Sequence, residues 1–247
     1  MLCELATTLS NDKMFAFTVR LVAKFFLAKQ WHALHPEIRR QEQLVLESPP
    51  SNSLVKLLVS GEDRRHGTHA GFDIRAIIRA TIHNILQHRH EGASTIEQQL
   101  VRVLTNRFER TFRRKLREIL LASLVAEYID KRHLPAIYLQ VGYFGTEMVG
   151  LDATCSRLGL NSKLLTLWQA ALVVARLKYP EPRAISQRRS KQISTRALHL
   201  IHLYQHHSQD RTYEFLKLSC IQDATYNCHV DHSTQSGVDF TSTEGKR

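Results

Sequence analysis

The sequence predicts a mainly α-helical protein. Apolar residues recur at helical spacing along most of the chain, several segments begin with residues that favour helix N-termini, and strict alternation of apolar and polar residues is absent. Hydrophobic residues make up 43% and charged residues 23% of the 247 residues. This composition is typical of globular proteins and excludes collagen-like, coiled-coil and fully disordered chains. A chain of this length can bury a core without disulfides or structural metal.

The first helical segment covers residues 1–48, with an expected break at Pro36 because proline disrupts the interior of a helix. Its most apolar part, Met14 to Ala28, is interrupted by Arg20 and Lys24. It therefore lacks the roughly 20 consecutive apolar residues of a membrane-spanning helix, and it is too charged for the core of a secretory signal. Two interpretations remain open: a helix that faces the core, and a basic amphipathic helix that lies on a membrane.

The next helices are predicted from the residues that begin them. Asp73 is expected to cap a helix that carries isoleucines along one side. Ser94 to Glu97 fits a capping box at the start of the following helix. Thr111 is expected to cap a long helix, and Pro135 suits the first turn of another.

Composition divides the chain into four segments. The prolines and polar residues of positions 48–52 indicate a loop at the first boundary. The last residues are rich in Ser, Thr, Asp and His and poor in apolar residues, which is typical of disorder. We expect an amphipathic helical N-terminal segment over residues 1–50, a helical domain over 51–185, a helical C-terminal extension over 186–219 and a disordered tail over 220–247.

The cysteines do not indicate a zinc ribbon or a disulfide framework, because the four of them form no CxxC pair. Cys228, His229 and His232 are of metal-ligand type, but four free thiols are the simpler interpretation.

The charge predicts an anionic partner. The 34 Lys and Arg residues outnumber the 23 Asp and Glu residues, for a net charge of +11; nucleic acid, an anionic membrane surface and a phosphorylated ligand all fit. Residues 102–117 hold seven of the basic residues and one acidic residue. Glu118 lies one helical turn from Arg114 and Lys115, and such cations keep a carboxylate ionised. This arrangement suits pyrophosphate bound beside an acid.

Two more clusters carry candidate functional residues. Residues 61–71 concentrate acids and histidines between glycines, so we expect a loop with titratable side chains. In residues 91–100, small residues let a ligand approach the backbone, and the helix N-terminus that follows suits an anion. Considered alone, residues 61–71 are explained better as a solvated charged loop, and residues 91–100 are explained equally well as an ordinary helix N-cap.

Together and in this order, the clusters resemble the motifs of the peptidoglycan glycosyltransferases, the transglycosylase domain of penicillin-binding proteins and of monofunctional enzymes. The resemblance covers about residues 54–182, and the order of five motifs makes it specific. The motifs are Glu62-Asp63 with His69 and Gly71; Gly92 to Ile96 with Gln98, Gln99 and Leu100; Arg110-Thr111 with Arg114, Lys115 and Glu118; Lys131 to Gly145; and the apolar helix around Ala170 to Leu172.

The resemblance implies a lysozyme-like helical glycosyltransferase domain with a smaller membrane-facing lobe, which we assign to residues 51–185. It implies polymerisation of lipid II into glycan strands with inversion and release of undecaprenyl pyrophosphate. Lipid II, the growing glycan strand and an anionic membrane surface are the implied partners, and no nucleic acid is expected. The implied location is the outer face of the bacterial cytoplasmic membrane. With no spanning helix or signal peptide visible, we expect peripheral contact through the Met14 to Ala28 helix.

The resemblance also implies roles for single residues. Glu62 matches the catalytic base, and Glu118 matches a second glutamate that assists departure of the pyrophosphate or positions a divalent ion, Mg²⁺ or Mn²⁺. The remaining matches bind substrate: Arg102, Arg110, Arg114 and Lys115 around the diphosphate, and Ser94, Gln98 and Gln99 along the donor site.

The chain departs from the family pattern at several positions. His66 stands where Phe is usual, Arg102 replaces Lys, Val103 and Gln140 each replace Asn, and Gln169 replaces Glu. A degraded, non-catalytic paralogue that binds lipid II or another polyanion is therefore an alternative. A lysozyme-like hydrolase would use paired carboxylates but would not need the cationic run. A helical nucleic-acid-binding protein would explain the charge but not the order of the motifs.

Overall fold

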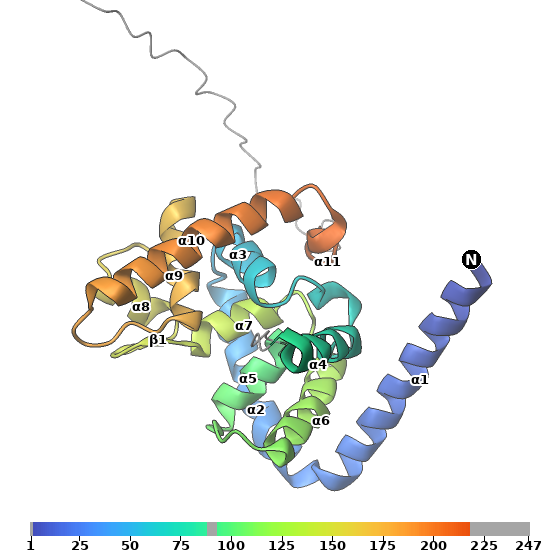
Figure 1. The fold of residues 1–247 in the computed structure, drawn as a ribbon. Coiled ribbons are helices and arrows are strands. Elements are labelled where there is room, and N and C mark those ends of the chain that lie inside the picture. The colour runs from blue at the N-terminus through green and yellow to red at the C-terminus, as the bar shows by residue number, and fades with distance from the viewer. Residues whose placement is uncertain (1, 88–92, 218–247) are drawn as a thin grey trace, which may run out of the picture. The chain divides into compact units, whose positions relative to one another are not determined.

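The computed structural model describes residues 2–87 and 93–217. The predicted tail over 220–247, with Cys228, His229 and His232, lies outside the described residues. The mainly α-helical prediction is confirmed (Figure 1). The division into four segments stays a prediction, although the chain between residues 48 and 52 does form a loop between two helices.

The elements follow one another as short and medium-length helices with one small hairpin. In chain order they are α1 (Leu2–Phe26), α2 (Ala28–Glu47), α3 (Asn52–Glu62), a 3-10 turn (His66–Thr68), α4 (Ile74–Gln87), α5 (Ile96–Leu104), α6 (Phe112–Tyr128), α7 (Leu134–Val141), β1 (Tyr143–Gly145), β2 (Met148–Val149), α8 (Leu151–Arg157), α9 (Leu167–Lys178), α10 (Gln187–His207), a second 3-10 turn (Arg211–Tyr213) and α11 (Glu214–Lys217).

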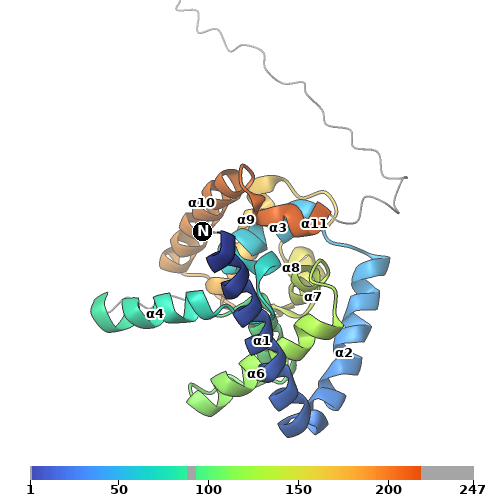
Figure 2. The same cartoon turned by 90° about the vertical axis from the view of Figure 1, so that its right-hand side faces the viewer.

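The core forms where α3, α5, α7 and α9 meet. Their apolar side chains are fully buried, as at Leu58, Leu100, Ile137 and Val173. Helix α10 lies across α9 and α3, α6 packs along α5, and α2 packs against α7 (Figures 1 and 2). Burial of these apolar faces is the main term that holds the helices together. It also brings the ends of α3, α5 and α6, which carry the candidate functional residues, to one region of the molecule.

The predicted break at Pro36 is wrong. Pro36 lies inside α2, and the chain turns instead at Leu27, whose φ of −120° and ψ of 17° depart from helical values. Pro36 and His32 are both exposed. The proline removes the N–H that would bond to the His32 carbonyl, and it does so on an exposed part of the helix, where a lost backbone hydrogen bond costs less than in the core.

Three of the four predicted helix starts are confirmed. The Asp73 carboxylate accepts from the N–H of Ala76 at 3.1 Å, the Thr111 hydroxyl accepts from the N–H of Arg114 at 3.2 Å, and Pro135 occupies the first turn of α7. These local bonds satisfy backbone donors that a helix start leaves free.

The predicted capping box at Ser94 and Glu97 is wrong by one residue. Thr95 is the N-cap of α5, and its hydroxyl accepts from the N–H of Gln98 at 3.3 Å. The Thr95 hydroxyl also donates to the Gly71 carbonyl at 2.8 Å, a tertiary bond that favours Thr95 over Ser94 as the cap. As a result, Ser94 is left to face other side chains and Glu97 becomes fully buried.

The hairpin of β1 and β2 was not expected from the sequence. Tyr143 pairs with Val149 and Gly145 with Met148. Gly145 has a φ of +151°, and a Cβ there would lie 2.3 Å from the Glu181 carbonyl oxygen, so only glycine fits. Strands this short leave no alternating pattern to detect.

Helix α1 packs on α6 through small residues and leaves large ones exposed. Ala16 and Ala23 are buried, whereas Phe25 is 80% and Phe26 71% exposed. Lys24 pairs with Glu127 of α6 at 2.9 Å. Helix α1 thus faces the rest of the molecule through its small residues, and both interpretations of it stay predictions. None of the described helices is long and apolar enough to cross a membrane.

Candidate active site

Glu62 is the last residue of α3 and not part of a loop, as residues 61–71 had suggested. The helix extends to Glu62 because the N–H of Asp63 still bonds to the Val59 carbonyl at 3.0 Å. Asp63 then turns into an extended conformation with a φ of −155°. A helix end is a more rigid support for a carboxylate than the expected loop.

Both carboxylate oxygens of Glu62 accept hydrogen bonds from neighbouring helices. Arg196 of α10 donates from Nη2 to Oε1 at 3.2 Å, and Gln99 of α5 donates from Nε2 to Oε2 at 3.2 Å. The Tyr138 hydroxyl of α7 donates to Oε1 of Gln99 at 2.7 Å, which orients the amide so that its NH₂ faces Glu62. Burial raises the pKa of Tyr138, so the phenol keeps the proton that it donates.

Glu118 of α6 is the centre of a cationic cluster. Its side chain is 3% exposed. Arg102 of α5 donates from Nε to Oε1 at 2.8 Å and from Nη2 to Oε2 at 3.2 Å, and Arg114 donates to Oε1. Lys115 Nζ lies 3.9 Å from Oε2. Because three cations surround one carboxylate, the cluster keeps an excess of positive charge that suits an anionic ligand.

Lys115 connects this cluster to the start of α5. Its ammonium group donates to the Ser94 hydroxyl at 2.9 Å and to the side-chain oxygen of Gln98. Burial lowers the pKa of Lys115 to about 8, and the nearby Arg102 and Arg114 add to this effect while Glu118 opposes it. Lys115 is therefore cationic at neutral pH and loses its charge in mildly alkaline solution.

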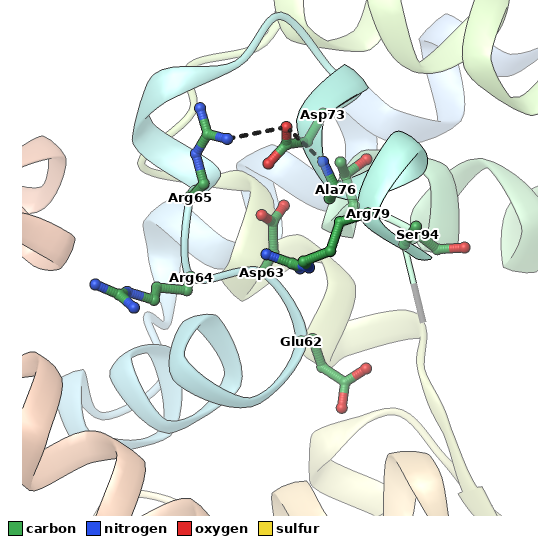
Figure 3. Close-up of a pocket in the computed structure, with 10 residues that line it drawn as sticks. Glu62, Asp63, Arg64, Arg65, Asp73, Ala76, Arg79 and Ser94 are labelled. Carbon is green, nitrogen blue, oxygen red and sulfur yellow. Dashed lines mark hydrogen bonds and ion pairs between the residues drawn. The ribbon is translucent and has the colours of Figure 1, made fainter. Parts of the chain in front are cut away.

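A cavity of about 440 Å³ brings Glu62 and Ser94 to one space (Figure 3). Arg64, Arg65, Asp73 and Arg79 are among its other lining residues; Arg65 pairs with Asp73 at 3.2 Å. Ser94 lines this cavity and accepts from Lys115, so the cationic cluster lies one hydrogen bond away from the cavity that Glu62 lines. Such a site can take a proton from a hydroxyl and stabilise negative charge on a departing group.

The structure brings together eight of the nine residues that the sequence predicted for the site. The exception is Arg110, which is exposed in the loop before α6 and takes part in no hydrogen bond or ion pair among the described residues. The eight others are Glu62, Ser94, Gln98, Gln99, Arg102, Arg114, Lys115 and Glu118. Their catalytic and binding roles stay predictions.

Arg196 and Tyr138 were missed as site residues. Arg196 lies on α10, outside the stretch where the sequence carries recognisable motifs, and nothing in its local sequence distinguishes it from a solvated arginine. Tyr138 belongs to a recognised motif, but only the packing of α7 on α5 shows its bond to Gln99.

Comparison with known proteins identifies the family. A family model described as Transglycosylase matches residues 30–204, which is well over half of the chain. The chain belongs to the transglycosylase family. The match extends beyond the motif-bearing residues 54–182 on both sides and includes most of α10, with Arg196. The helical architecture is consistent with the lysozyme-like domain predicted for this family.

Several relatives support this membership. The chain is 34% identical over 156 residues to the biosynthetic peptidoglycan transglycosylase of Thiobacillus denitrificans, covering 62% of this chain and 66% of the relative. The chain is 32% identical over 151 residues to the protein of the same name from Nitrosomonas eutropha, covering 60% of this chain and 62% of the relative. Penicillin-binding protein 1A of Aquifex aeolicus is 37% identical over 129 residues, covering 51% of this chain and 18% of the relative. The chain thus spans less than two thirds of the length of these relatives.

The residues around Glu118 do not form a divalent cation site by themselves. Glu118 offers one carboxylate, and Arg102, Arg114 and Lys115 already surround it. Among the described residues, the groupings of possible metal ligands do not include Glu118. The expected Mg²⁺ or Mn²⁺ stays a prediction, and no catalytic step is derived through it.

Proposed function

We propose that this member of the transglycosylase family is a peptidoglycan glycosyltransferase. In the proposed reaction it polymerises lipid II into glycan strands with inversion at the anomeric carbon and releases undecaprenyl pyrophosphate. The observation that carries the proposal is that Glu62 shares a cavity with Ser94, which is hydrogen-bonded to Lys115 of the cationic cluster around Glu118. The chemistry needs both, a base for the acceptor and positive charge for the leaving group.

In this mechanism Glu62 accepts the proton of the acceptor's sugar hydroxyl while the hydroxyl oxygen bonds to the anomeric carbon. The bond from that carbon to the diphosphate oxygen breaks, and its electron pair leaves with the diphosphate. Arg102, Arg114 and Lys115 stabilise the charge that develops there. Glu118 holds the two arginines in place through its own ion pairs, so it acts through them.

Arg196 and Gln99 position the Glu62 carboxylate at the edge of the cavity. Each donates to a different oxygen, and because a carboxylate oxygen has two lone pairs, the acceptor hydroxyl can bond to Glu62 beside them. The alternative of a non-catalytic lipid II binder stays open, because the pair with Arg196 occupies one of the positions on Glu62 that a hydroxyl could use. Measured turnover separates the two functions.

The proposed location is the outer face of the bacterial cytoplasmic membrane, where lipid II is presented for polymerisation. The exposed aromatic residues of α1 and the net charge of +11 support contact with an anionic membrane surface. Lipid II and the growing glycan strand are the proposed partners.

The test replaces Glu62 by glutamine, which keeps the shape of the side chain and removes the base. We expect Glu62→Gln to lower glycan polymerisation from purified lipid II by at least about a hundredfold, the scale of general base catalysis. The control is Glu37→Gln on α2, where the partners of the carboxylate among the described residues are Arg40 and Gln41 of the same helix. Near-normal turnover in Glu62→Gln would refute the assignment, and no turnover in the unaltered chain with retained lipid II binding would favour the non-catalytic binder.

A further inference from the structure

A second group of ligand-type side chains lies beside the active site and takes no part in the proposed mechanism. Asp63, His66 and His69 follow α3, and Glu97 lies in the first turn of α5. Each offers one ligand atom, and these four atoms lie within 4.8 Å of one another. The side chains of His66 and Glu97 are 0% exposed.

His66 is held with one ring nitrogen aimed into this group. Its Nε2 bonds to the Lys131 carbonyl oxygen at 2.9 Å, and because a carbonyl only accepts, Nε2 carries a proton. The other nitrogen, Nδ1, lies 3.5 Å from Oδ2 of Asp63 and 3.6 Å from Oε1 of Glu97. Within the described part of the chain it has no hydrogen-bond partner, and neither does Oε2 of Glu97. Buried polar atoms are normally paired, so two unpaired ones on neighbouring members of this group need an explanation.

We propose that Asp63, His66 and Glu97 bind a divalent transition ion, with Zn²⁺ the reference case. Ligands of a tetrahedral zinc ion at 2.0–2.1 Å lie about 3.3 Å from one another, close to the two distances from Nδ1 of His66. Imidazole nitrogen with carboxylate oxygen is a donor set typical of such ions. The bond from Nε2 to a backbone carbonyl is the support that metal-binding histidines generally have.

His69 supports the site rather than joining the ligands. Its Nδ1 accepts from the N–H of Gly71 at 3.2 Å, so in the neutral ring the proton is on Nε2. Nε2 donates to both oxygens of Asp63, at 3.1 and 3.0 Å, and the N–H of Ile96 donates to Oδ2 at 3.1 Å. These bonds hold the Asp63 carboxylate in position, as supporting groups do for carboxylate ligands.

Lys131 is the competitor for the ion. Its ammonium group bonds to Oε1 of Glu97 at 3.1 Å and to the His66 carbonyl at 2.5 Å, and its side chain is 21% exposed. A divalent ion and an ammonium group repel each other, so binding requires Lys131 to move toward solvent. The cavity of about 440 Å³ is lined by Asp63 and provides an entry path for the ion.

The site would have a structural effect on the catalytic region. It joins Asp63, which directly follows Glu62, to α5, which carries Gln98 and Gln99. A bound ion would therefore fix the end of α3 against the start of α5. The binding itself does not depend on the proposed glycosyltransferase activity, and the two proposals can fail separately.

The experiment measures zinc binding by the whole chain after treatment with a chelator. Equilibrium dialysis against ZnCl₂ gives the stoichiometry and Kd, and the melting temperature gives the effect on stability. We expect His66→Phe to bind one equivalent fewer than the unaltered chain; an aromatic ring suits the position because His66 packs 5.1 Å from the ring of Phe215. Glu97→Gln, which keeps an acceptor for Lys131, should weaken binding at least about tenfold.

Two further variants complete the test. Lys131→Gln should tighten zinc binding, because it removes the competing charge; a merely structural role for the cluster predicts no such gain. The matched control is His206→Ala, in the other described grouping of possible ligands, His206, His207 and Asp210. Equal zinc stoichiometry in the unaltered chain and in His66→Phe, with no weakening in Glu97→Gln, would overturn the proposal. The absence of zinc binding by the unaltered chain would also overturn the proposal. It would mean that a proton on Nδ1 of His66, and not a metal ion, fills this position.

Discussion

Replacing Lys115 by methionine should stabilise the fold while weakening substrate binding. Methionine matches the length of the lysine stem and removes the buried charge. Burial lowers the pKa of Lys115 from its ordinary value of 10.5 to about 8. The charged form of Lys115 is therefore more favourable in the unfolded chain than in the folded protein. At pH 7 this difference lowers the free energy of unfolding by about 3 kcal/mol.

The hydrogen bonds of Lys115 offset part of this gain. Its ammonium group bonds to Ser94 and Gln98, and each bond contributes about 1 kcal/mol. The net increase in the free energy of unfolding is thus about 1–2 kcal/mol at pH 7. Below pH 8, Lys115 is charged in both the folded and the unfolded chain, so the full penalty on the free energy of unfolding applies. Above pH 8 the folded protein loses the proton first, and the penalty disappears as the pH approaches 10.5. Between pH 7 and pH 9.5 the advantage of Lys115→Met should shrink by about 2 kcal/mol.

Urea unfolding at pH 7, 8.5 and 9.5 measures this difference for both proteins. The control is Lys163→Met, at an exposed lysine outside the cluster, whose effect should not change over this range. Binding of purified lipid II at pH 7 should weaken in Lys115→Met by about tenfold or more, the loss of one charge-assisted hydrogen bond. A Lys115→Met protein that is less stable than the unaltered chain at pH 7, or a difference independent of pH, would refute the reasoning.

Three further predictions concern the site and the surface. Tyr138→Phe removes the hydroxyl that orients Gln99 and should lower polymerisation about tenfold, since it deletes one neutral hydrogen bond, while thermal unfolding changes little. Replacing Phe25 and Phe26 together by serine should reduce flotation of the whole chain with anionic vesicles more than with neutral ones, because both rings are exposed on a basic helix. Arg114→Ala should weaken lipid II binding more than it weakens DNA binding, measured on the same variant at several salt concentrations.

Each of these has an opposing outcome. Unchanged turnover in Tyr138→Phe would mean that Gln99 needs no orienting partner. Equal flotation of the double serine variant and the unaltered chain would assign membrane contact to another surface. Tight, salt-sensitive DNA binding without lipid II affinity would favour the nucleic-acid-binding alternative for the basic residues of α5 and α6.

The sequence alone determined the features that depend on neighbouring residues. Asp73 and Thr111 cap helices because their side chains reach backbone donors three residues later, a contact visible in the sequence. Glu118 meets Arg114 and Lys115 because residues three and four apart share a helix face. The same periodicity predicted the mainly helical fold, and the order of the motifs predicted the family.

Tertiary structure decided the rest, because packing joins residues that are distant in the chain. The network of Glu62, Gln99, Tyr138 and Arg196 comes from four helices, and no local pattern predicts it. The cap at Thr95 was chosen by a bond to Gly71, 24 residues away. Pro36 lies within α2 at an exposed position, and the chain turns at Leu27 instead. Local sequence sets which conformations are favourable, but burial and long-range hydrogen bonds decide which side chains meet.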